Sequence, residues 1–361
     1  MLGFLKYIRS CALTRNWTLC VLLVVMVSVG CLSVVKWSIL YLQQIPQLPE
    51  GDNPHDYKYI LKPGSNSCNG LFSPELVICV SSSVANFEER ATLRDTWASV
   101  VKDQVHYATL FFFMGRPSRN ETALQAALRR EQAQYDDIVQ EDFMDTYNNL
   151  SLKTVSILKW ASYNCPNSKF VVKADDDVYV TIPNMLKALR EASMFHEEFV
   201  LGVINFFAIA GHPERSGKDA VTMEYPYMMY PLYIIGPTYA MPISSAKLLY
   251  RASLRMPHHR AEDVYVTGFL AREAGVSLVN DDRFSGHRWP IDGCVFRSKV
   301  SGHGYSSKEQ RAIHAKMLDS SILCTESVSL AHTMGSTLFV WLTVFMILAL
   351  WLGLSRCTSV K

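Results

Sequence analysis

Two uncharged apolar runs, one near each end, most constrain how this chain can fold, because each is about long enough to cross a lipid bilayer. The first, residues 17–35, holds 19 residues without a charge, close to the roughly 20 that a membrane-spanning helix needs. Lys6, Arg9 and Arg15 precede it, and only one lysine follows closely. Positive charge stays on the cytosolic side. We therefore expect residues 1–16 to be a cytosolic tail and residues 17–35 an uncleaved signal anchor.

The second apolar run, residues 335–354, is also about one bilayer long and is followed by Arg356 and Lys361. We expect a second transmembrane helix here, with residues 355–361 as another cytosolic tail. A GPI-anchor signal is one alternative, but its apolar tail normally ends the chain. A buried C-terminal helix is another, and the apolar residues all round the helix count against it. The chain between the two runs would then be lumenal.

Composition separates a stem from a folded domain. Residues 36–70 are rich in Pro, Gly, Asn and Asp, which is typical of a stem, and residues 71–324 are long enough for a domain with a sizeable core. Lys and Arg (35) nearly balance Asp and Glu (33), and no long basic run occurs, so we expect no nucleic-acid partner.

Five cysteines lie between the apolar runs. A secretory lumen permits disulfides, but five is an odd number, so at least one thiol should be free, and we expect it to be Cys79 in an apolar run.

Strand-like and helix-like segments alternate along the folded region. We expect strands at 75–80, 106–115, around Ile138 and before Asp175, and helices at 87–97, 121–134 and 151–163. A βαβα order favours an α/β fold with a mainly parallel central sheet. Ligands bind such sheets at the carboxyl ends of the strands, and an acidic motif follows one of these ends.

Three consecutive aspartates, Asp175–Asp177, follow an apolar strand directly. Adjacent carboxylates repel one another unless they are solvated or neutralised, so an exposed acidic turn is one interpretation. A site for Mn²⁺ or Mg²⁺ is the other, because hard cations take oxygen ligands and often bind through one or two carboxylates plus substrate phosphates.

A second acidic pair, Glu262–Asp263, opens a segment with apolar residues at helical spacing. An aspartate at a helix start is most often a cap, but Asp263 could also present a free carboxylate to a pocket. Between the two acidic motifs, residues 224–242 are dense in Tyr and Pro and include Gly236. Aromatic rings with polar tips suit a sugar, although a Pro-rich pair of buried strands would have the same composition.

Two Asn-X-Ser/Thr sequons, at Asn120 and Asn149, lie in the expected lumenal region. Each is a candidate for N-glycosylation. Asn149 also falls within a longer motif, so a structural role competes with glycosylation there.

Five motifs occur in an order that is typical of a known family. They are RATLRDTW (90–97), DTYNNLSLKT (145–154), FVVKADDDVYV (170–180), EYPYMMYPLYIIGPTYAMP (224–242) and EDVYVTGF (262–269). Together they resemble the signatures of the β1,3-galactosyltransferase family, glycosyltransferase family 31, over residues 71–324. The resemblance implies a GT-A nucleotide-sugar-binding fold in a type II Golgi membrane protein with a lumenal catalytic domain. It also implies an inverting, metal-dependent transfer of galactose from UDP-galactose to the 3-hydroxyl of an acceptor sugar on a glycolipid or glycoprotein.

The resemblance implies roles for the acidic residues. A divalent cation would neutralise the charge that departing UDP carries. Asp177 is the expected direct ligand, while Asp175 and Asp176 lie nearer the ribose or the metal-bound waters, so that Asp175 is a candidate for both metal and donor. Inversion in one displacement needs a separate carboxylate as the base, and Asp263 is the expected one.

Other positions also match the family's motifs. A histidine downstream of the base commonly completes the metal site, and His287 in FSGHRW is preferred to His303, with a surface or core histidine as the alternative. Residues expected at the donor nucleotide are Arg90, Arg94 and Lys153, and a solvated helix face is the alternative for the arginines. Residues expected at the acceptor or sugar pocket are Glu224, Tyr225, Gly236 and Glu262.

The sequence departs from the family pattern in two places. Family members ordinarily end with the catalytic domain, whereas here a second apolar run follows. The segment YVTGF (265–269) is one residue longer than the usual form and lies beside the expected base. Two other functions remain open: transfer of N-acetylglucosamine from UDP-GlcNAc, and a non-catalytic lumenal sugar-binding scaffold, which the intact acidic motifs disfavour.

Overall fold

The computed structural model describes residues 53–64, 68, 73–102, 107–206 and 229–319, with the single residues 25, 26, 28, 30, 32, 33, 321 and 324. The described residues up to 318 belong to one compact unit, and those from 319 belong to a second. Of the expected transmembrane segments, 17–35 is described at six positions, and 335–354 lies outside the described residues. Among the residues described, no helix combines the length and the apolarity needed to cross a membrane.

Strands and helices alternate along the described chain. Its first part consists of β1 (Tyr59–Leu61), β2 (Leu76–Ser81), α3 (Phe87–Asp95), the 3-10 helix η1 (Trp97–Lys102), β3 (Ala108–Arg116), α4 (Thr122–Tyr135), β4 (Ile138–Met144), the 3-10 helix η2 (Tyr147–Asn149), α5 (Leu150–Asn164) and β5 (Phe170–Asp175). Its second part consists of β6 (Val178–Val180), α6 (Ile182–Ser193), β7 (Phe199–Gly202), β8 (Ile204–Asn205), β9 (Tyr233–Ile234), β10 (Thr238–Pro242), α7 (Ile243–Ser253), the π-helix η4 (Val264–Leu270), α8 (Ala271–Ala274), β11 (Ser277–Asn280), α9 (Gly293–Ser298), β12 (Ser301–His303) and α10 (Ser307–Leu318).

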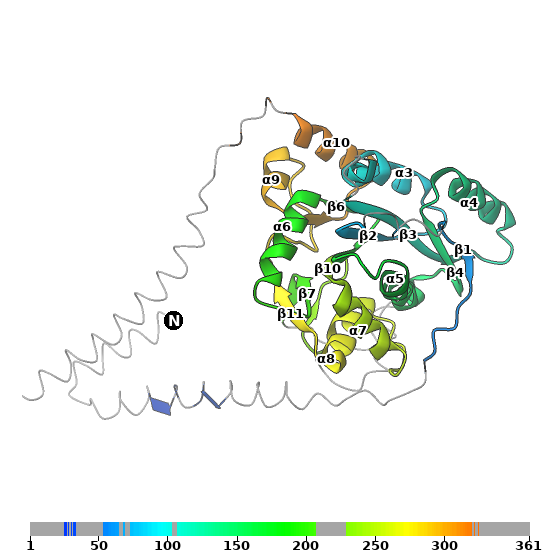
Figure 1. The fold of residues 1–361 in the computed structure, drawn as a ribbon. Helices are drawn as coiled ribbons and strands as arrows, with labels where there is room; N and C mark the ends of the chain where they lie inside the picture. The colour runs from blue at the N-terminus through cyan, green and yellow to red at the C-terminus, as the bar shows by residue number, and fades with distance from the viewer. Residues whose placement is uncertain are drawn as a thin grey trace, which may run out of the picture. The chain divides into compact units, whose positions relative to one another are not determined.

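A mixed sheet of eight strands lies at the centre, in the order β1-β4-β3-β2-β5-β10-β7-β11 (Figure 1). The strands β4, β3, β2 and β5 run parallel, as the βαβα order predicted. β10 is antiparallel to both β5 and β7, and β1 is antiparallel to β4. The α/β prediction is therefore confirmed, and the parallel arrangement dominates only the part built from the first half of the chain.

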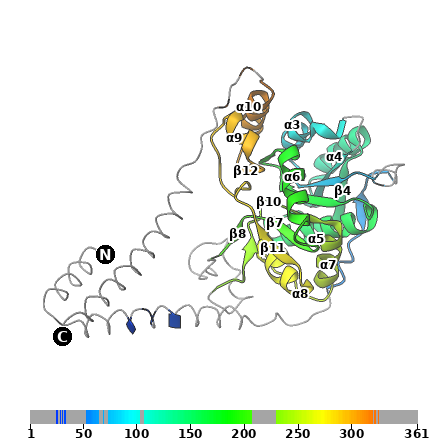
Figure 2. The same ribbon diagram turned by 60° about the vertical axis from the view of Figure 1, so that its left-hand side comes forward.

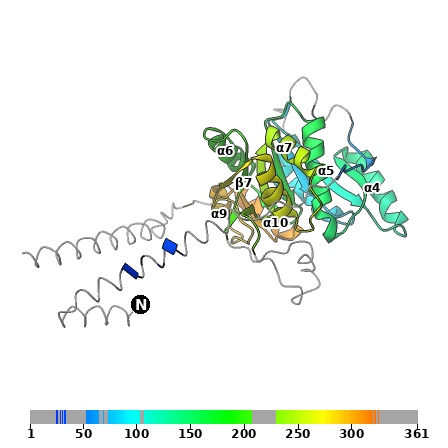
Figure 3. The same cartoon turned by 90° about the horizontal axis from the view of Figure 1, so that it is seen from below.

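Helices cover both faces of this sheet (Figures 2 and 3). The helices α5, α7 and α8 pack on one face, and α3, α4, α6, α9 and α10 pack on the other. Along β2, Leu76, Ile78 and Val80 enter one core while Val77 and Cys79 enter the other. A strand covered on both faces has no solvent-facing position, which explains why this segment is apolar throughout.

The antiparallel strand β10 shapes the carboxyl end of β5. Thr238 at the start of β10 lies opposite Ala174 near the end of β5. The backbone N–H of Asp175 donates a hydrogen bond to the carbonyl of Pro237 (3.0 Å). The chain just before β10, including Gly236, is therefore held beside the first aspartate of the acidic motif.

The folded unit begins earlier than the expected boundary at residue 71. β1, within the expected stem, pairs with β4. The side chain of Asn53 donates a hydrogen bond to the carbonyl of Ser253 (3.1 Å), and His55 Nε2 lies 2.8 Å from Glu141 Oε2 in a buried pair. Residues 53–64 thus belong to the folded unit, because short polar segments gain order from such specific contacts without any periodic apolar pattern.

The cysteines follow the expectation for a secreted domain. Cys68 and Cys165 form a disulfide across 97 residues, and Cys294 and Cys324 are also disulfide-bonded. Within the described part of the chain, Cys79 is the free cysteine and it is buried. The prediction for Cys79 is confirmed.

Candidate active site

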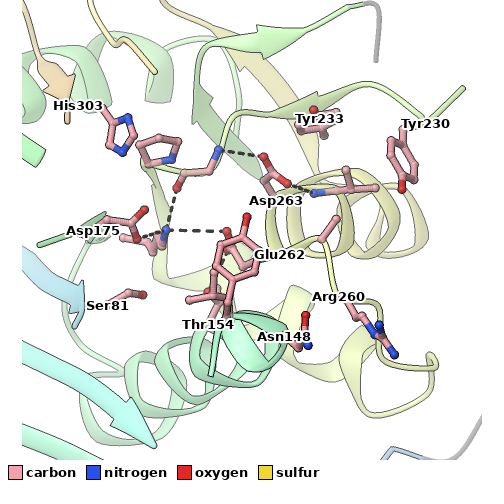
Figure 4. A pocket seen from close by; sticks show the side chains of 17 residues that line it. Ser81, Asn148, Thr154, Asp175, Tyr230, Tyr233, Arg260, Glu262, Asp263 and His303 are labelled. Atoms are coloured by element: carbon pink, nitrogen blue, oxygen red, sulfur yellow. Dashed lines mark hydrogen bonds and ion pairs between the residues drawn. The ribbon is translucent and has the colours of Figure 1, made fainter. Parts of the chain in front are cut away.

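A cavity of about 650 Å³ opens at the carboxyl end of β5, where the two acidic motifs meet. From one side to the other, its lining includes His303, Asp175, Glu262, Asp263 and Tyr230 (Figure 4). The two motifs, far apart in the sequence, meet because β10 returns along β5 and places the Gly236–Pro237 turn between them.

Asp175, Asp177 and His303 form a group, here called the Asp–His cluster, whose side chains could hold a cation. One potential ligand atom from each lies within 4.8 Å of the others, and His303 Nε2 is 3.2 Å from Asp177 Oδ2. A divalent cation lies about 2.0–2.6 Å from each nitrogen or oxygen ligand. The three atoms are therefore close enough to share one ion, and their oxygen and nitrogen chemistry suits Mn²⁺ or Mg²⁺.

The pairing of β12 with β6 determines which histidine lies in this cluster. β12 pairs with β6 so that His303 lies opposite Val178, the residue after Asp177. His287, the residue preferred from sequence, is exposed and lines a separate cavity of about 390 Å³. Its contact with the cluster is through the backbone, where its carbonyl accepts a hydrogen bond from the His303 N–H (3.2 Å). The preference for His287 over His303 is thus not supported by the geometry. The hydrogen bond to Asp177 raises the pKa of His303.

Asp176 is directed toward the loop between β2 and α3. Its Oδ2 accepts hydrogen bonds from Ser82 Oγ (2.7 Å) and Asn86 Nδ2 (2.9 Å). Burial raises the pKa of Asp176, and these two hydrogen bonds oppose that shift. Asp176 thus fixes this loop beside the Asp–His cluster, on the side where the donor nucleotide was expected.

Asp263 both caps a helical segment and lines the cavity. Its Oδ1 accepts a hydrogen bond from the Val264 N–H (2.9 Å), and its Oδ2 accepts one from the Gly236 N–H (3.2 Å). A carboxylate offers about four lone-pair sites, so these bonds leave it able to accept a proton from a ligand in the cavity. Burial raises the pKa of Asp263, and the two backbone hydrogen bonds oppose the shift.

Lys173 is a site residue that sequence analysis missed. It is buried near the end of β5, and its Nζ donates hydrogen bonds to Asp175 Oδ1 (2.6 Å) and to the Gly236 carbonyl (2.7 Å). Burial alone would lower the pKa of this ammonium, but the carboxylates of Asp175 and Glu262 hold it above its ordinary value. A signal was present, because a lysine inside an apolar strand needs a charged partner.

Glu262 is buried on the floor of the cavity. Its Oε1 accepts hydrogen bonds from Thr154 Oγ1 (2.9 Å) and Tyr239 OH (2.6 Å), and its Oε2 lies 3.8 Å from Lys173 Nζ. Burial raises the pKa of Glu262, and Lys173 opposes the shift. Several carboxylates therefore surround the single ammonium of Lys173, and a divalent cation at the Asp–His cluster would offset the excess negative charge.

Arg90 and Arg94 are structural residues, contrary to the expectation that they contact the donor. Arg90 is 0% exposed. All five of its N–H donors are used, on Glu131, on the Ser82 hydroxyl and on the carbonyls of residues 83 and 84. Arg94 is held by Glu131 and Asp137 and lies over the ring of Tyr135. Two arginines opposite two acids form a neutral buried group that holds the loop after β2.

Lys153 also supports this loop and is not among the residues that line the cavity. Its buried Nζ donates hydrogen bonds to the Ser82 carbonyl (2.8 Å) and to Asp145 Oδ1 (3.0 Å). Arg90 and Lys153 therefore hold the loop after β2 from beneath, on the side of the cavity where the donor was expected.

The side of the cavity away from the Asp–His cluster carries aromatic and polar side chains. They are Asn148, Tyr230, Tyr233 and Arg260, all labelled in Figure 4. Tyr147 also lines the cavity. Tyr147 is 70% exposed, and the Tyr233 hydroxyl accepts a hydrogen bond from Asn205 Nδ2 (2.9 Å). Gly236 lies in the cavity wall as expected, whereas Glu224 and Tyr225 lie outside the described residues.

The two sequons differ in their surroundings. Asn120 is exposed in a turn before α4. Asn149 donates a hydrogen bond from Nδ2 to the Met144 carbonyl (2.8 Å), and Ser151 of its sequon is fully buried with its hydroxyl bonded to the His259 carbonyl. The Asn149 sequon is therefore part of the packed structure beside the cavity.

Known proteins resemble this chain over most of the described region. A family model described as galactosyltransferase matches residues 88–282. UDP-GalNAc:beta-1,3-N-acetylgalactosaminyltransferase 1 of Homo sapiens is 31% identical over 259 residues, covering 70% of this chain and 77% of that protein. Beta-1,3-galactosyltransferase 1 of Mus musculus is 29% identical over 266 residues, covering 72% and 78%. Among solved structures, the galactosyltransferase LgtC with donor and acceptor sugar analogs has a TM-score of 0.35 at 11% identity, covering 70% of this chain and 98% of that one, a likeness too distant to carry a conclusion. The match to the family model and the identity to the human relative show that this chain belongs to the galactosyltransferase family.

Proposed function

We propose that the chain is an inverting, metal-dependent β1,3-galactosyltransferase with a GT-A fold, which moves galactose from UDP-galactose to the 3-hydroxyl of an acceptor sugar on a glycolipid or glycoprotein. One observation carries this proposal: Asp175 and His303 of the Asp–His cluster line the same cavity as a separate carboxylate, Asp263, with Lys173 between them. The donor diphosphate needs a cation to offset its charge, and the acceptor hydroxyl needs a separate carboxylate as its base.

The donor side is assigned to the Asp–His cluster and the loop after β2. Asp175, Asp177 and His303 would hold Mn²⁺ or Mg²⁺, and when bound, this ion supplies positive charge that stabilises the diphosphate leaving group. Asp176 keeps the neighbouring loop in place through Ser82 and Asn86. The buried arginines and Lys153 fix that loop from beneath, so the donor meets a preformed surface.

Asp263 is assigned the role of general base. In the proposed reaction, the acceptor oxygen forms a bond to the anomeric carbon while the bond from that carbon to the phosphate oxygen breaks and UDP leaves. The hydroxyl proton goes to Asp263, whose carboxylate the N–H groups of Val264 and Gly236 orient. Raising the pKa of Asp263 by burial also makes it a stronger base.

The acceptor side is assigned to the aromatic end of the cavity. Tyr230 offers a ring face for a sugar, and Asn148 and Arg260 offer hydrogen-bond donors for its hydroxyls. Asp263 lies between this end and the Asp–His cluster (Figure 4). An acceptor entering here would bring its hydroxyl to the base from the side opposite the donor phosphates.

The donor sugar has two main candidates because the similar proteins carry two names, one for galactose and one for N-acetylgalactosamine. UDP-GlcNAc is a third donor with the same diphosphate chemistry. We place the protein in the Golgi membrane with its catalytic domain in the lumen, held by the two apolar runs. The Cys68–Cys165 disulfide supports an oxidising compartment.

The test is a transfer assay with the purified full-length protein, UDP-Gal, UDP-GalNAc and UDP-GlcNAc, and a panel of glycoside acceptors, with Mn²⁺ or with EDTA. We expect transfer that depends on the metal and is lost in both Asp177→Ala and Asp263→Asn. The matched control is Asp142→Asn, which removes an acid that is 57% exposed and paired with Arg116 at the surface. Full activity in EDTA would exclude the metal mechanism, and nucleotide-sugar binding without transfer to any acceptor would favour the scaffold.

A further inference from the structure

The segment after the expected base forms a π-helix. Glu262 and Asp263 begin as an α-helix, the chain then widens into η4 from Val264 to Leu270, and α8 follows without a break. A π-turn bonds residue i to i+5 and so contains one residue more than an α-turn.

Thr267, in the middle of η4, joins this turn to the strand β9. It is 0% exposed. Its Oγ1 accepts a hydrogen bond from the Ile234 N–H (2.8 Å), and it lies 2.7 Å from the Asp263 carbonyl and 3.1 Å from the Ile234 carbonyl, to either of which it can donate. One hydroxyl therefore contacts the backbone of the base and the backbone of the neighbouring strand.

Gly268 lets β9 and the chain before it approach the same turn closely. A Cβ at this position would lie 3.2 Å from Pro231 Cγ and 3.4 Å from Tyr233 Cβ. The strand is thus held against η4 by shape at Gly268 and by hydrogen bonds at Thr267. The position of β9 therefore depends on both Thr267 and Gly268.

The strand held in this way carries the groups that orient the base. Two residues after Ile234, the Gly236 N–H donates to Asp263 Oδ2 (3.2 Å), and the Gly236 carbonyl accepts from Lys173 Nζ (2.7 Å). A shift of β9 away from η4 would therefore move the N–H that holds the Asp263 carboxylate and the carbonyl that holds Lys173.

We infer that Thr267, with Gly268 beside it, is a positioning residue for the transfer reaction: the π-turn fixes β9, and β9 fixes the carboxylate of Asp263 through Gly236. This inference rests on the proposed role of Asp263 as the base. Thr267 is fully buried and is not among the residues that line the cavity, so its removal should lower kcat far more than it changes the KM for the donor.

The experiment compares Thr267→Val, Thr267→Ser and Gly268→Ala in the full-length protein. Valine keeps the shape of threonine but removes the hydroxyl, while serine keeps the hydroxyl. Thr92→Val is the matched control, because Thr92 is also 0% exposed and its hydroxyl has no hydrogen-bond partner within the described part of the chain. Two quantities are measured: kcat and donor KM in the transfer assay, and hydrogen exchange of backbone amides over residues 233–238.

In Thr267→Val we expect exchange over 233–238 to become at least about fivefold faster, since the buried Ile234 N–H loses its acceptor. We expect kcat to fall at least about tenfold while the donor KM changes less than about threefold. Thr267→Ser should restore both quantities, Gly268→Ala should change them in the same direction as Thr267→Val, and Thr92→Val should leave them unchanged.

Wild-type exchange or wild-type kcat in Thr267→Val overturns the inference, as does an equal loss in Thr92→Val. If Thr267→Val does not fold, Gly268→Ala decides by the same two measurements. A wild-type protein that transfers no hexose would refute the proposed function instead. In that case the exchange comparison, which needs no catalysis, still decides whether Thr267 holds the strand that carries Gly236.

Discussion

Replacing Lys173 with methionine tests how strongly the two acidic motifs depend on the ammonium between them. Lys173 Nζ lies 3.8 Å from Glu262 Oε2. At an effective dielectric constant of about 20, two charges at that distance interact by about 4 kcal/mol, and removing one partner of a buried ion pair costs about 3–5 kcal/mol. The side chain of Asp175 is 33% exposed, so water compensates part of its loss. We therefore expect Lys173→Met to lower the free energy of unfolding by about 3 kcal/mol.

The assay is thermal unfolding of the purified protein in EDTA, so that metal binding does not contribute. For a folded region of this size, 1 kcal/mol shifts Tm by about 2–4 °C, and we expect Lys173→Met to unfold about 6–12 °C lower than wild type at pH 7. Burial already raises the pKa of Glu262, and Lys173 opposes that shift. Without Lys173 the pKa rises further. A raised carboxyl pKa destabilises the fold at higher pH, and the cost disappears as the pH falls through that pKa and the acid becomes neutral.

The difference in Tm should therefore be smaller at about pH 5 than at about pH 7. Lys187→Met is the matched control, because Lys187 is 69% exposed and lies 4.0 Å from Glu191, and such surface pairs contribute about 0–1 kcal/mol. An equal Tm for Lys173→Met and wild type at both pH values would show that Lys173 does not compensate the buried carboxylates, and would refute the charge argument for this site.

Three further predictions concern the metal, the base and the sequons. His303→Ala should weaken Mn²⁺ binding at least about tenfold in titration calorimetry, whereas His287→Ala should leave it nearly unchanged; the reverse order would restore the ligand chosen from sequence. At saturating Mn²⁺, kcat should be constant at higher pH and fall as the pH drops through the raised pKa of Asp263, so the acid limb should lie above the ordinary aspartate value of about 3.9; a limb at or below that value would contradict this role. Asn120→Gln should remove a glycan that a glycosidase can release, and Asn149→Gln should not alter glycan content; a glycan lost from Asn149 instead would show that this sequon is modified before the chain packs around it.

The first half of the fold could be predicted from sequence because its strands are buried on both faces. The expected strand at 75–80 corresponds to β2 (76–81), and the expected helix at 121–134 corresponds to α4 (122–135). Continuous apolar runs and helical periodicity mark such elements without knowledge of their partners. The direction of β10 could not be predicted in this way, because a five-residue strand carries no local signal for parallel or antiparallel pairing. β1 has three residues in a Pro- and Gly-rich segment, and so short a run shows no pattern that would predict a strand.

The sequence located the acidic motifs, but it did not show which acids the nearby cationic side chains contact. Arg90 and Arg94 lie one helical turn apart near the expected nucleotide pocket, which made them attractive donor contacts. Their actual partners, Glu131 and Asp137, come from the next βα unit. Nothing in the spacing of the arginines reveals whether acids some 40 residues away will bury them. The same limit applies to the histidine of the Asp–His cluster, which the pairing of β12 with β6 determines.

Thr267 shows how a buried residue can act on the expected base through a neighbouring strand. In the sequence it follows Asp263 closely, which suggests a direct effect on the surroundings of that carboxylate. In the structure, Thr267 of the wider turn acts on the strand that leads to Gly236, and Gly236 in turn holds the carboxylate. The wider turn of η4 is joined to β9 by the hydrogen bonds of Thr267 and by the close approach at Gly268. The π-helix and the chain just before β10 therefore form one structural unit, and a substitution in either should alter the orientation of the same carboxylate.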